Sequence, residues 1–247
     1  MKIYGLIGYP LGHSFSKKYF TEKFAGEGIS NAAYELFPIE EINLLPELIK
    51  NNEELIGLNV TIPYKEQVLP YIHEFDNTAE SIQAVNCIKI IRNNKDILLR
   101  GYNTDAYGFE TALKPLLENH HKKALIFGTG GASKAVEFVL RKLNIEYKYV
   151  SRTPRQNIIG YRDIDKDVLH EYSILINTSP LGMHPNLDSA PDIPYEVLTD
   201  QHLLYDLVYN PEETKFMKLG MKNGAKAENG LKMLYGQAEK AWEIWNG

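Results

Sequence analysis

The sequence predicts an α/β protein built from two domains. Strand-like and helix-like runs alternate along nearly the whole chain, which is the pattern of parallel sheets covered by helices. A glycine-rich turn joins a strand to a helix near the middle of the chain, within residues 123–141. The chain has 247 residues, of which 44% are hydrophobic, enough to bury a core in each of two domains.

The glycine-rich turn has the features of a dinucleotide-binding loop. Residues 124–127 form an apolar run of strand length, and apolar residues recur at helical spacing from Ala135 to Leu143. Between them, Gly128-x-Gly130-x-x-Ser133 matches the dinucleotide fingerprint, with a serine in place of the third glycine. The first glycine permits a tight turn, and the second lets N–H groups at the helix N-terminus approach a pyrophosphate. An ordinary strand-to-helix turn is the alternative, but the flanking strand and helix favour a Rossmann-type domain, which must be the second because the turn lies mid-chain.

Composition and charge narrow the class of protein. Lys and Arg number 27 against 32 Asp and Glu, and the resulting net charge of −5 argues against a nucleic-acid or anionic membrane partner. Cys87 is the only cysteine, which excludes an intrachain disulfide and a cysteine-based metal site. No apolar run reaches the ~18 residues of a membrane span, and we expect no signal peptide and no metal. The sequence therefore predicts a cytoplasmic protein.

The first third of the chain alternates between strands and helices. This βαβαβ order implies a mostly parallel sheet, in which ligands bind at the carboxyl ends of the strands. The predicted strands are residues 2–8, 33–39 and 55–62, and the predicted helices are residues 17–25 and 41–50.

Polar residues follow two of these strands. Ser14 and Ser16 precede the first helix, where two hydroxyls can converge on one anion; the alternative is that one of them is the helix N-cap. Asn59, Thr61 and Lys65 lie at the end of the third strand, although a lone lysine after a proline is commonly a solvated surface charge. We regard all five as candidate ligand-binding residues.

A hairpin and the start of a helix complete the first half. Asn86 lies inside the apolar strand 84–88, and an amide there needs a partner, either a backbone group or a ligand. Residues 96–103 are predicted to pair back as a hairpin, with its turn at Asn93-Asn94. Asp105 then falls in the first turn of a helix. The helix dipole stabilises a carboxylate at that position, so Asp105 needs no further role.

The strand after the glycine turn, residues 146–150, ends at Ser151 and Arg152. An acidic residue about 20 positions after the glycines holds the ribose 2′-hydroxyl of NAD, whereas an arginine accommodates the 2′-phosphate of NADP. This position carries no acid, so NADP is favoured, although an exposed loop arginine without a role is the alternative.

Gln237 lies at the border of a buried helix face, where an amide caps a backbone group or contacts a ligand. The remaining predicted elements are strands 173–177, 203–209 and 225–229 and helices 212–222 and 231–245.

Nine short motifs together resemble the shikimate dehydrogenase family. They occur in the family's order with similar gaps, so the resemblance covers nearly the whole chain. Each motif alone is weak, but the ordered set is specific. The motifs are Ser14-Phe15-Ser16, Asn59-Val60-Thr61-x-Pro63-x-Lys65, Ala84-Val85-Asn86, Asn103-Thr104-Asp105-x-x-Gly108, Gly128-x-Gly130-Gly131-Ala132-Ser133, Arg152-Thr153, Asn177-x-Ser179-x-x-Gly182-Met183, Asp206-x-x-Tyr209 and Gly230-Leu231-x-Met233-x-x-x-Gln237.

The resemblance implies an activity and an architecture. The activity is the reversible, NADPH-dependent reduction of 3-dehydroshikimate to shikimate in aromatic amino acid biosynthesis. The architecture is an N-terminal three-layer α/β substrate domain, residues 1–104, followed by a Rossmann-type NADP-binding domain, residues 105–230. The last helix, residues 231–247, is expected to return and pack on the first domain. A monomer or homodimer is expected.

The resemblance also implies roles for individual residues. Lys65 would be the catalytic acid/base, with Asp105 as its partner. The other roles are given by group: Ser14, Ser16 and Tyr209 for the carboxylate of shikimate; Thr61, Asn86, Asp105 and Gln237 for its ring hydroxyls; Gly128, Thr129, Gly130, Gly131 and Ala132 for the pyrophosphate; Ser151, Arg152 and Thr153 for the adenosine end; and Leu207, Gly230 and Met233 for the nicotinamide side.

The chain departs from the family pattern at several positions. Lys17 stands where the family commonly has a proline, and Ser151 where it commonly has an asparagine. The change at Ser151 leaves an NAD-using quinate/shikimate dehydrogenase as one alternative. A non-catalytic or regulatory protein that kept the fold is another, and the retention of Lys65 and Asp105 argues against it.

Overall fold

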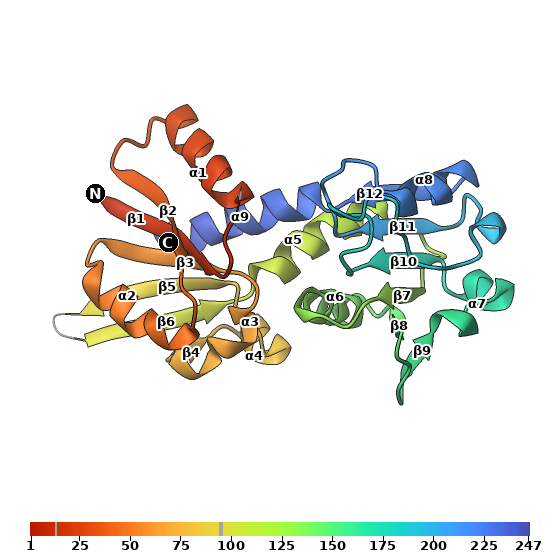
Figure 1. The fold of residues 1–247 in the computed structure, drawn as a ribbon, viewed down its shortest axis with the longest axis horizontal. Coiled ribbons are helices and arrows are strands. Elements are labelled where there is room, and N and C mark those ends of the chain that lie inside the picture. The colour runs from red at the N-terminus through yellow and green to blue at the C-terminus, as the bar shows by residue number, and fades with distance from the viewer. Residues whose placement is uncertain (13, 94–95) are drawn as a thin grey trace. The chain divides into compact units, whose positions relative to one another are not determined.

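Two six-stranded sheets organise the chain (Figure 1). The computed structural model describes residues 1–12, 14–93 and 96–247. The chain divides into two compact units, of which the first comprises residues 1–104 and 238–247 and the second comprises residues 105–237. Each sheet lies in its own unit, and the predicted α/β class is confirmed.

The sheet of the first unit has the strand order β2-β1-β3-β5-β6-β4. β2, β1 and β3 are parallel, as the βαβαβ pattern predicted, whereas β5 runs antiparallel to both β3 and β6. The predicted hairpin is thus confirmed, but Asn94 of its predicted turn lies outside the described residues. The elements are β1 (Lys2–Gly8), α1 (Phe15–Gly26), β2 (Ala32–Pro38), α2 (Leu45–Asn51), β3 (Leu55–Val60), α3 (Tyr64–Gln67), β4 (Glu74–Phe75), α4 (Asn77–Ile82), β5 (Cys87–Asn93) and β6 (Asp96–Tyr102).

Helices cover both faces of this sheet, which gives the first unit three layers. On one face, α1 and the end of α9 (Leu231–Asn246) bury an aromatic cluster that includes Tyr4, Phe20 and Trp245. On the other face, α2 packs Leu45 against the sheet. The last helix therefore supplies part of the core of a unit that begins at residue 1.

The sheet of the second unit has the strand order β12-β11-β10-β7-β8-β9, and all its strands are parallel. The chain starts at β7, moves outward to β8 and β9, and then returns to β10 on the other side of β7. Ligands of such sheets bind at the carboxyl ends of the strands where the order reverses, here between β7 and β10. The elements are α5 (Thr104–Leu113), β7 (Lys123–Phe127), α6 (Gly131–Lys142), β8 (Glu146–Ser151), β9 (Ile158–Gly160), α7 (Lys166–Glu171), β10 (Ile174–Asn177), β11 (Leu203–Asp206), α8 (Lys215–Lys222) and β12 (Lys226–Asn229).

The structure moves several predicted boundaries. The first helix starts at Phe15, because Ser14 caps it. The third strand ends at Val60, and the strand predicted to contain Asn86 begins one residue after it. The strand predicted to reach Tyr209 ends at Asp206, whose carboxylate accepts the N–H of Val208 and turns the chain.

Two helices also differ from their predicted ranges. The helix predicted for residues 41–50 begins as a 3-10 turn and becomes α2 only at Leu45. The helix predicted for residues 212–222 begins at Lys215, because Thr214 caps it. In the last helix, residues 231–237 belong to the second unit, whereas the sequence assigned them to the first.

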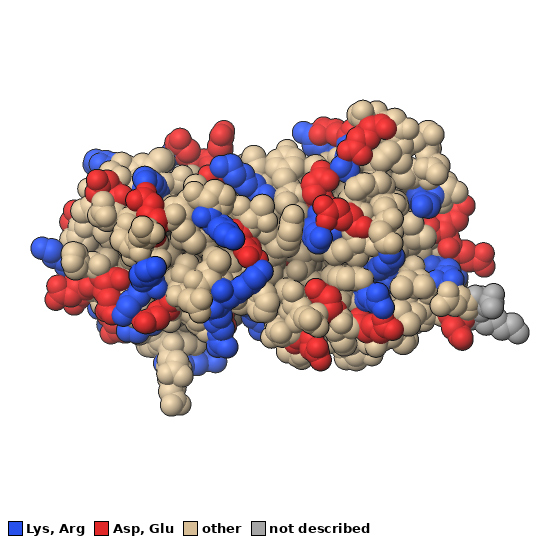
Figure 2. Space-filling model, turned by 180° about the vertical axis from the view of Figure 1, so that it is seen from behind, with Lys and Arg blue, Asp and Glu red and all other residues tan. Residues whose placement is uncertain are grey.

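On the face shown in Figure 2, acidic and basic side chains are interspersed. Across the described ranges, every helix is too short or too polar to cross a membrane.

Candidate functional site

The carboxyl ends of β1 and β3 bring three predicted residues to one edge of the first sheet. Thr61 donates its N–H to the Ile7 carbonyl at 3.0 Å. The carbonyl of Lys65, in α3, accepts the N–H of Val85 at 2.8 Å, and the next residue, Asn86, accepts the N–H of Val60 at 2.9 Å. Thr61, Lys65 and Asn86 are thus held together by backbone bonds, although they lie in three different segments.

Asn86 is anchored by the residue that opens α5. Its Nδ2 donates to Thr104 Oγ1 at 3.0 Å, and its Oδ1 accepts the Thr104 N–H at 2.6 Å. The side chain is 3% exposed. The sequence predicted that this amide needs a partner, and the backbone N–H of Thr104 is one of its partners.

A buried chain of hydrogen bonds extends from Asn86 toward Ser16. Asn59 Nδ2 donates to the Asn86 carbonyl at 3.4 Å, and the Tyr34 hydroxyl donates to Asn59 Oδ1 at 2.7 Å. Burial raises the pKa of Tyr34 well above its usual value, while a hydrogen bond with Ser16 acts in the opposite direction. Phe20 stacks on the Tyr34 ring at 4.6 Å and fixes it. This series of hydrogen bonds therefore fixes the positions of Ser16 and Asn86 relative to each other.

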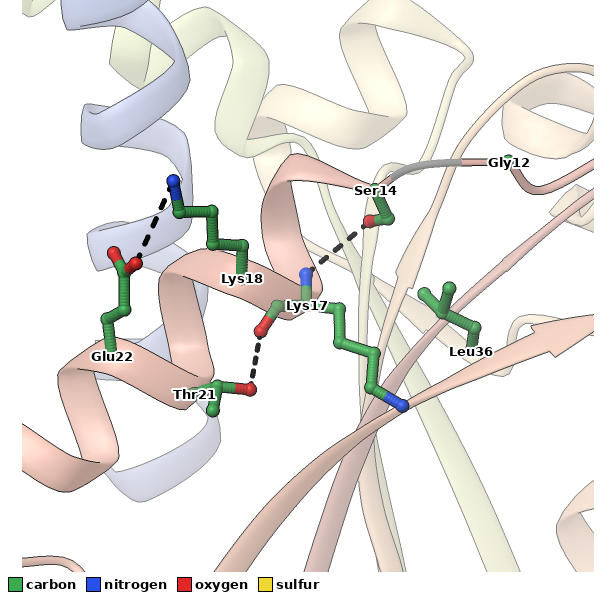
Figure 3. Close-up of a pocket in the computed structure, with 7 residues that line it drawn as sticks. All are labelled: Gly12, Ser14, Lys17, Lys18, Thr21, Glu22 and Leu36. Atoms are coloured by element: carbon green, nitrogen blue, oxygen red, sulfur yellow. Dashed lines mark hydrogen bonds and ion pairs between the residues drawn. The ribbon is translucent and has the colours of Figure 1, made fainter.

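Ser14 lines an open pocket of about 400 Å³ (Figure 3). Its Oγ accepts the N–H of Lys17 at 3.4 Å, so it is the helix cap that the sequence offered as the alternative. Lys17 and Lys18, which line the pocket, pair with Glu35 at 2.8 Å and with Glu22 at 3.8 Å. Because each of these two cations has a carboxylate partner, the pocket wall carries no evident excess of positive charge.

The glycine loop of the second unit leaves room for a ligand. A side-chain carbon at Gly130 or Gly131 would meet no atom within 4 Å, so the backbone at the start of α6 is open to approach. Gly128 has a φ of +112°, and a side-chain carbon there would lie 2.9 Å from Thr178 Oγ1. The first glycine thus permits the turn, and the next two keep the helix N-terminus accessible.

Ser151, Arg152 and Thr153 follow β8, the strand beside β7. Gly128 donates its N–H to the Val150 carbonyl at 3.0 Å, which places the glycine loop next to this strand end. Ser151 Oγ accepts the Thr153 N–H at 3.2 Å, and Arg152 is exposed. An exposed guanidinium beside an anion-binding loop is suited to a phosphate group.

Leu207, Gly230 and Met233 gather beyond the ends of β10 and β11. The Leu207 N–H donates to the Asn177 carbonyl at 2.9 Å. A side-chain carbon at Gly230 would lie 2.1 Å from the Leu207 carbonyl oxygen, so only glycine fits against this loop. Met233 is buried in the first turn of α9, one turn after Gly230.

Asp105 and Gln237 lie on two helices that cross closely. A side-chain carbon at Gly108 of α5 would be 2.4 Å from the Met233 carbonyl oxygen and 3.0 Å from the Gln237 nitrogen of α9. Asp105 is 8% exposed, one turn before Gly108. The Gln237 side chain donates a hydrogen bond from Nε2 to the Leu234 carbonyl at 3.0 Å, which is the backbone-capping role considered for it.

Tyr209 is partly exposed after β11, and burial raises the pKa of its phenol.

The chain resembles known proteins along its whole length. Residues 6–88 match the model of the shikimate dehydrogenase substrate binding domain. A shikimate dehydrogenase (NADP(+)) from Clostridium beijerinckii is 40% identical over 99% of this chain and 92% of its own length. The protein of the same name from Caldanaerobacter subterraneus subsp. tengcongensis is 37% identical over 100% of this chain and 92% of its own length. This chain belongs to the shikimate dehydrogenase family.

A solved member of the shikimate dehydrogenase family shares the fold. The crystal structure of shikimate 5-dehydrogenase from Thermus thermophilus in complex with NADP(H) and shikimate is 29% identical, with a TM-score of 0.86. It covers 100% of this chain, which in turn covers 94% of that structure. The likeness therefore includes both units.

Three residues that the sequence did not single out for the site help to organise it. The sequence predicts Tyr34 only as part of a strand. Its hydroxyl bonds to Asn59, which lies on another strand, so the sequence does not show this contact. Thr104 belongs to a family motif, but nothing in the sequence pairs it with Asn86. Asp206 also lies in a motif, and its fully buried carboxylate became evident only in the structure. Isolated hydroxyls and carboxylates have no periodicity, so sequence patterns do not detect such contacts.

Proposed function

We propose that this chain is an NADP-dependent shikimate dehydrogenase that reversibly reduces 3-dehydroshikimate to shikimate, as part of aromatic amino acid biosynthesis. The observation that carries the proposal is full-length similarity to relatives of that name, at 37–40% identity. The chain also retains a lysine at the carboxyl end of β3 and an open glycine loop at the carboxyl end of β7. These are the two features that proton transfer and dinucleotide binding require.

NADP fits the second unit. The backbone at Gly130 and Gly131 is open, and the helix N-terminus that it begins favours an anionic pyrophosphate. Arg152, with Ser151 and Thr153, would hold the adenosine end and its 2′-phosphate. Leu207, Gly230 and Met233 would border the nicotinamide. The bound cofactor supplies a hydride to the carbonyl carbon of the substrate.

Shikimate carries a carboxylate and three ring hydroxyls, and the site offers groups for both. Ser14 and Ser16 lie at the N-terminus of α1, where the helix dipole favours an anion, and Tyr209 would add a third hydroxyl. Thr61, Asn86, Asp105 and Gln237 would bond to the ring hydroxyls. The Tyr34–Asn59 chain would keep Ser16 and Asn86 at the separation that one ring acid requires.

Lys65 would move the proton. In the reductive direction its ammonium donates a proton to the carbonyl oxygen as that oxygen gains negative charge, and in the oxidative direction its amine accepts the hydroxyl proton. Asp105 would be its partner and would hold the ammonium in place. The backbone bond between the Lys65 carbonyl and Val85 fixes the start of α3, where the lysine lies.

The proposal extends to the cellular compartment and the oligomeric state of the protein. Cys87 is buried and forms no disulfide, which suits a reducing compartment, and we propose the cytoplasm. A monomer or a homodimer is proposed as the active form.

An absorbance assay of the reduced nicotinamide tests the function. Shikimate and quinate are each offered with NADP⁺ and with NAD⁺. We expect the highest kcat/KM for shikimate with NADP⁺. A higher kcat/KM for quinate with NAD⁺ would support a quinate/shikimate dehydrogenase. That alternative is considered because Ser151 replaces the family's common asparagine. No turnover with any of the four pairs, by protein that binds NADP⁺, would identify a non-catalytic relative.

A further inference from the structure

A fully buried carboxylate lies at the carboxyl end of β11. Asp206 is 0% exposed, and each of its bonds comes from a neutral donor. Oδ1 accepts Asn177 Nδ2 at 2.9 Å and the Val208 N–H at 3.0 Å, and Oδ2 accepts the Thr214 hydroxyl at 2.6 Å. Burial raises the pKa of Asp206 to about 6, although these three bonds act against the rise.

The carboxylate connects two loops that follow neighbouring strands. Through Val208 it fixes the loop after β11, which contains Leu207. Through Asn177 it reaches the loop after β10, because Asn177 Oδ1 accepts the N–H and the hydroxyl of Ser179 at 3.1 and 2.6 Å, and Asn177 Nδ2 also donates to the Leu181 carbonyl at 3.1 Å. One side chain thus sets the relative position of both loops.

The loop after β10 also contacts the glycine loop. Thr178 donates its hydroxyl to the Phe127 carbonyl at 3.0 Å, at the end of β7. The strand order places β10 and β11 on one side of β7 and β8 on the other. In a doubly wound sheet a dinucleotide lies across this reversal point, with one nucleotide on each side. Because Arg152 follows β8, the loops that Asp206 connects lie on the nicotinamide side.

A charged group in this position is costly. An ionised carboxylate without a cation partner loses much of its hydration when buried, and apolar residues of similar volume pack at lower cost. A charged acceptor nevertheless bonds to N–H and O–H donors about twice as strongly as a neutral one. The benefit of the charge is therefore a firmer hold on its donors. Val208 and Thr214 lie between β11 and α8, and Asn177 also bonds to the loop after β10.

We propose that Asp206 is a positioning residue for the nicotinamide half of the cofactor site, which it holds in shape by tying together the loops after β10 and β11. The inference rests on the proposed function, because it assumes NADP as the ligand. Asp206 acts through Leu207 and the backbone of the loops, not by contact with the substrate.

The test compares two ligands that differ only in the nicotinamide half. NADP⁺ contains both halves, whereas 2′,5′-ADP contains only the adenosine half, with its 2′-phosphate and its 5′-phosphate. Dissociation constants are measured by titration calorimetry on the full chain and on two variants. Asp206→Asn keeps the shape but removes the charge, and Asp165→Asn makes the same change at an exposed carboxylate, which caps α7 by accepting the Val168 N–H at 2.9 Å.

We expect Asp206→Asn to raise the Kd for NADP⁺ by about three- to tenfold, the difference between charged and neutral acceptors. The same variant is expected to leave the Kd for 2′,5′-ADP unchanged. Asp165→Asn is expected to leave both dissociation constants unchanged, because asparagine also caps a helix and Asp165 follows β9 rather than β10 or β11. An Asp206→Asn chain that binds both ligands as wild type does, or binds both more weakly by the same factor, overturns the inference.

A pH series on the wild-type chain needs no variant, so the inference remains testable if Asp206→Asn does not fold. The ratio of the Kd for NADP⁺ to the Kd for 2′-phospho-ADP-ribose, which has the same 2′-phosphate and pyrophosphate but no nicotinamide, cancels the titration of the phosphate groups. Protonation removes the Asp206 charge, so this ratio should rise as the pH falls through about 6. Tyr195 is a titratable group that interacts electrostatically with Asp206, and burial, followed by the Asp206 charge, raises its pKa, so it stays neutral throughout. A flat ratio between pH 8 and pH 5 overturns the inference, whereas a wild-type chain that binds neither ligand overturns the proposed function itself.

Discussion

Lys65, which we propose as the acid/base, has surroundings that its place in the sequence does not reveal. By sequence it is a lysine after a proline, which is usually a surface residue. In the structure it is partly buried at the start of α3, and its carbonyl is bonded to Val85, next to Asn86. Thr61 and Asn86 therefore lie near the same strand end, and the lysine is placed among groups suited to bind a polyhydroxy acid.

Replacement of Lys65 by alanine should lower kcat by about 10²–10⁴-fold, because the proton donor is lost while the fold is kept. Steady-state assays with shikimate and NADP⁺ measure the effect, and circular dichroism checks the fold. Lys50→Ala is the matched control, because Lys50 is an exposed lysine in the last turn of α2. Near-normal turnover of the Lys65 variant would rule out its acid/base role.

Replacement of Arg152 by alanine should raise KM for NADP⁺ much more than KM for NAD⁺, since only NADP⁺ has a 2′-phosphate for the guanidinium. Both constants are measured with saturating shikimate. Arg155→Ala removes another exposed arginine three residues later and should change neither. Equal effects of Arg152→Ala on the two cofactors would show that Arg152 does not contact the phosphate.

At the scale of elements, close helix contact decides where several site residues lie. α5 and α9 cross at Gly108, where the α9 backbone occupies the space of a side chain. Asp105 precedes this contact by one turn, and Gln237 is part of it. The positions of these two candidates therefore depend on a glycine that contributes no functional group.

Replacement of Gly108 by alanine should lower the free energy of unfolding by about 1–3 kcal/mol, the usual cost of overpacking. The cost arises because the new carbon would lie 2.4 Å from the Met233 carbonyl oxygen, a backbone atom that cannot rotate away. Denaturant unfolding measures the change. Gly26→Ala at the end of α1 is the control, since nothing lies within 4 Å there and alanine favours helix. Equal stability of the two variants would contradict the close crossing.

At the scale of the whole molecule, the first unit is assembled from both ends of the chain. Residues 238–247 pack with residues 1–104, although 133 residues of the second unit separate the two segments in sequence. Trp245 contacts Tyr4 at a ring separation of 5.0 Å and donates its indole N–H to the Ile88 carbonyl at 3.0 Å. Gly57 makes room for this ring, because a side-chain carbon there would lie 2.4 Å from it.

Replacement of Trp245 by alanine should therefore destabilise the protein by about 3–5 kcal/mol, as expected for a buried aromatic residue. Thermal unfolding followed by circular dichroism is the measurement. Glu243→Ala, on the exposed side of the same helix, removes only a surface pair with Lys240 and should change stability by at most about 1 kcal/mol. A Trp245 variant as stable as the Glu243 variant would show that the last helix does not support the first unit.

The sequence alone determined the α/β class, the glycine loop, most strands and helices, and the family, because period, turn residues and ordered motifs are local or additive properties. It also indicated Asn86 as a residue in need of a partner. Only the tertiary structure decided which partner that is, that Tyr34 and Asn59 join Ser16 to Asn86, and that Asp206 ties two loops together. These contacts join residues 18 to 29 positions apart on neighbouring strands and loops, and the free energy of a buried hydrogen bond depends on that spatial arrangement, which no local pattern encodes.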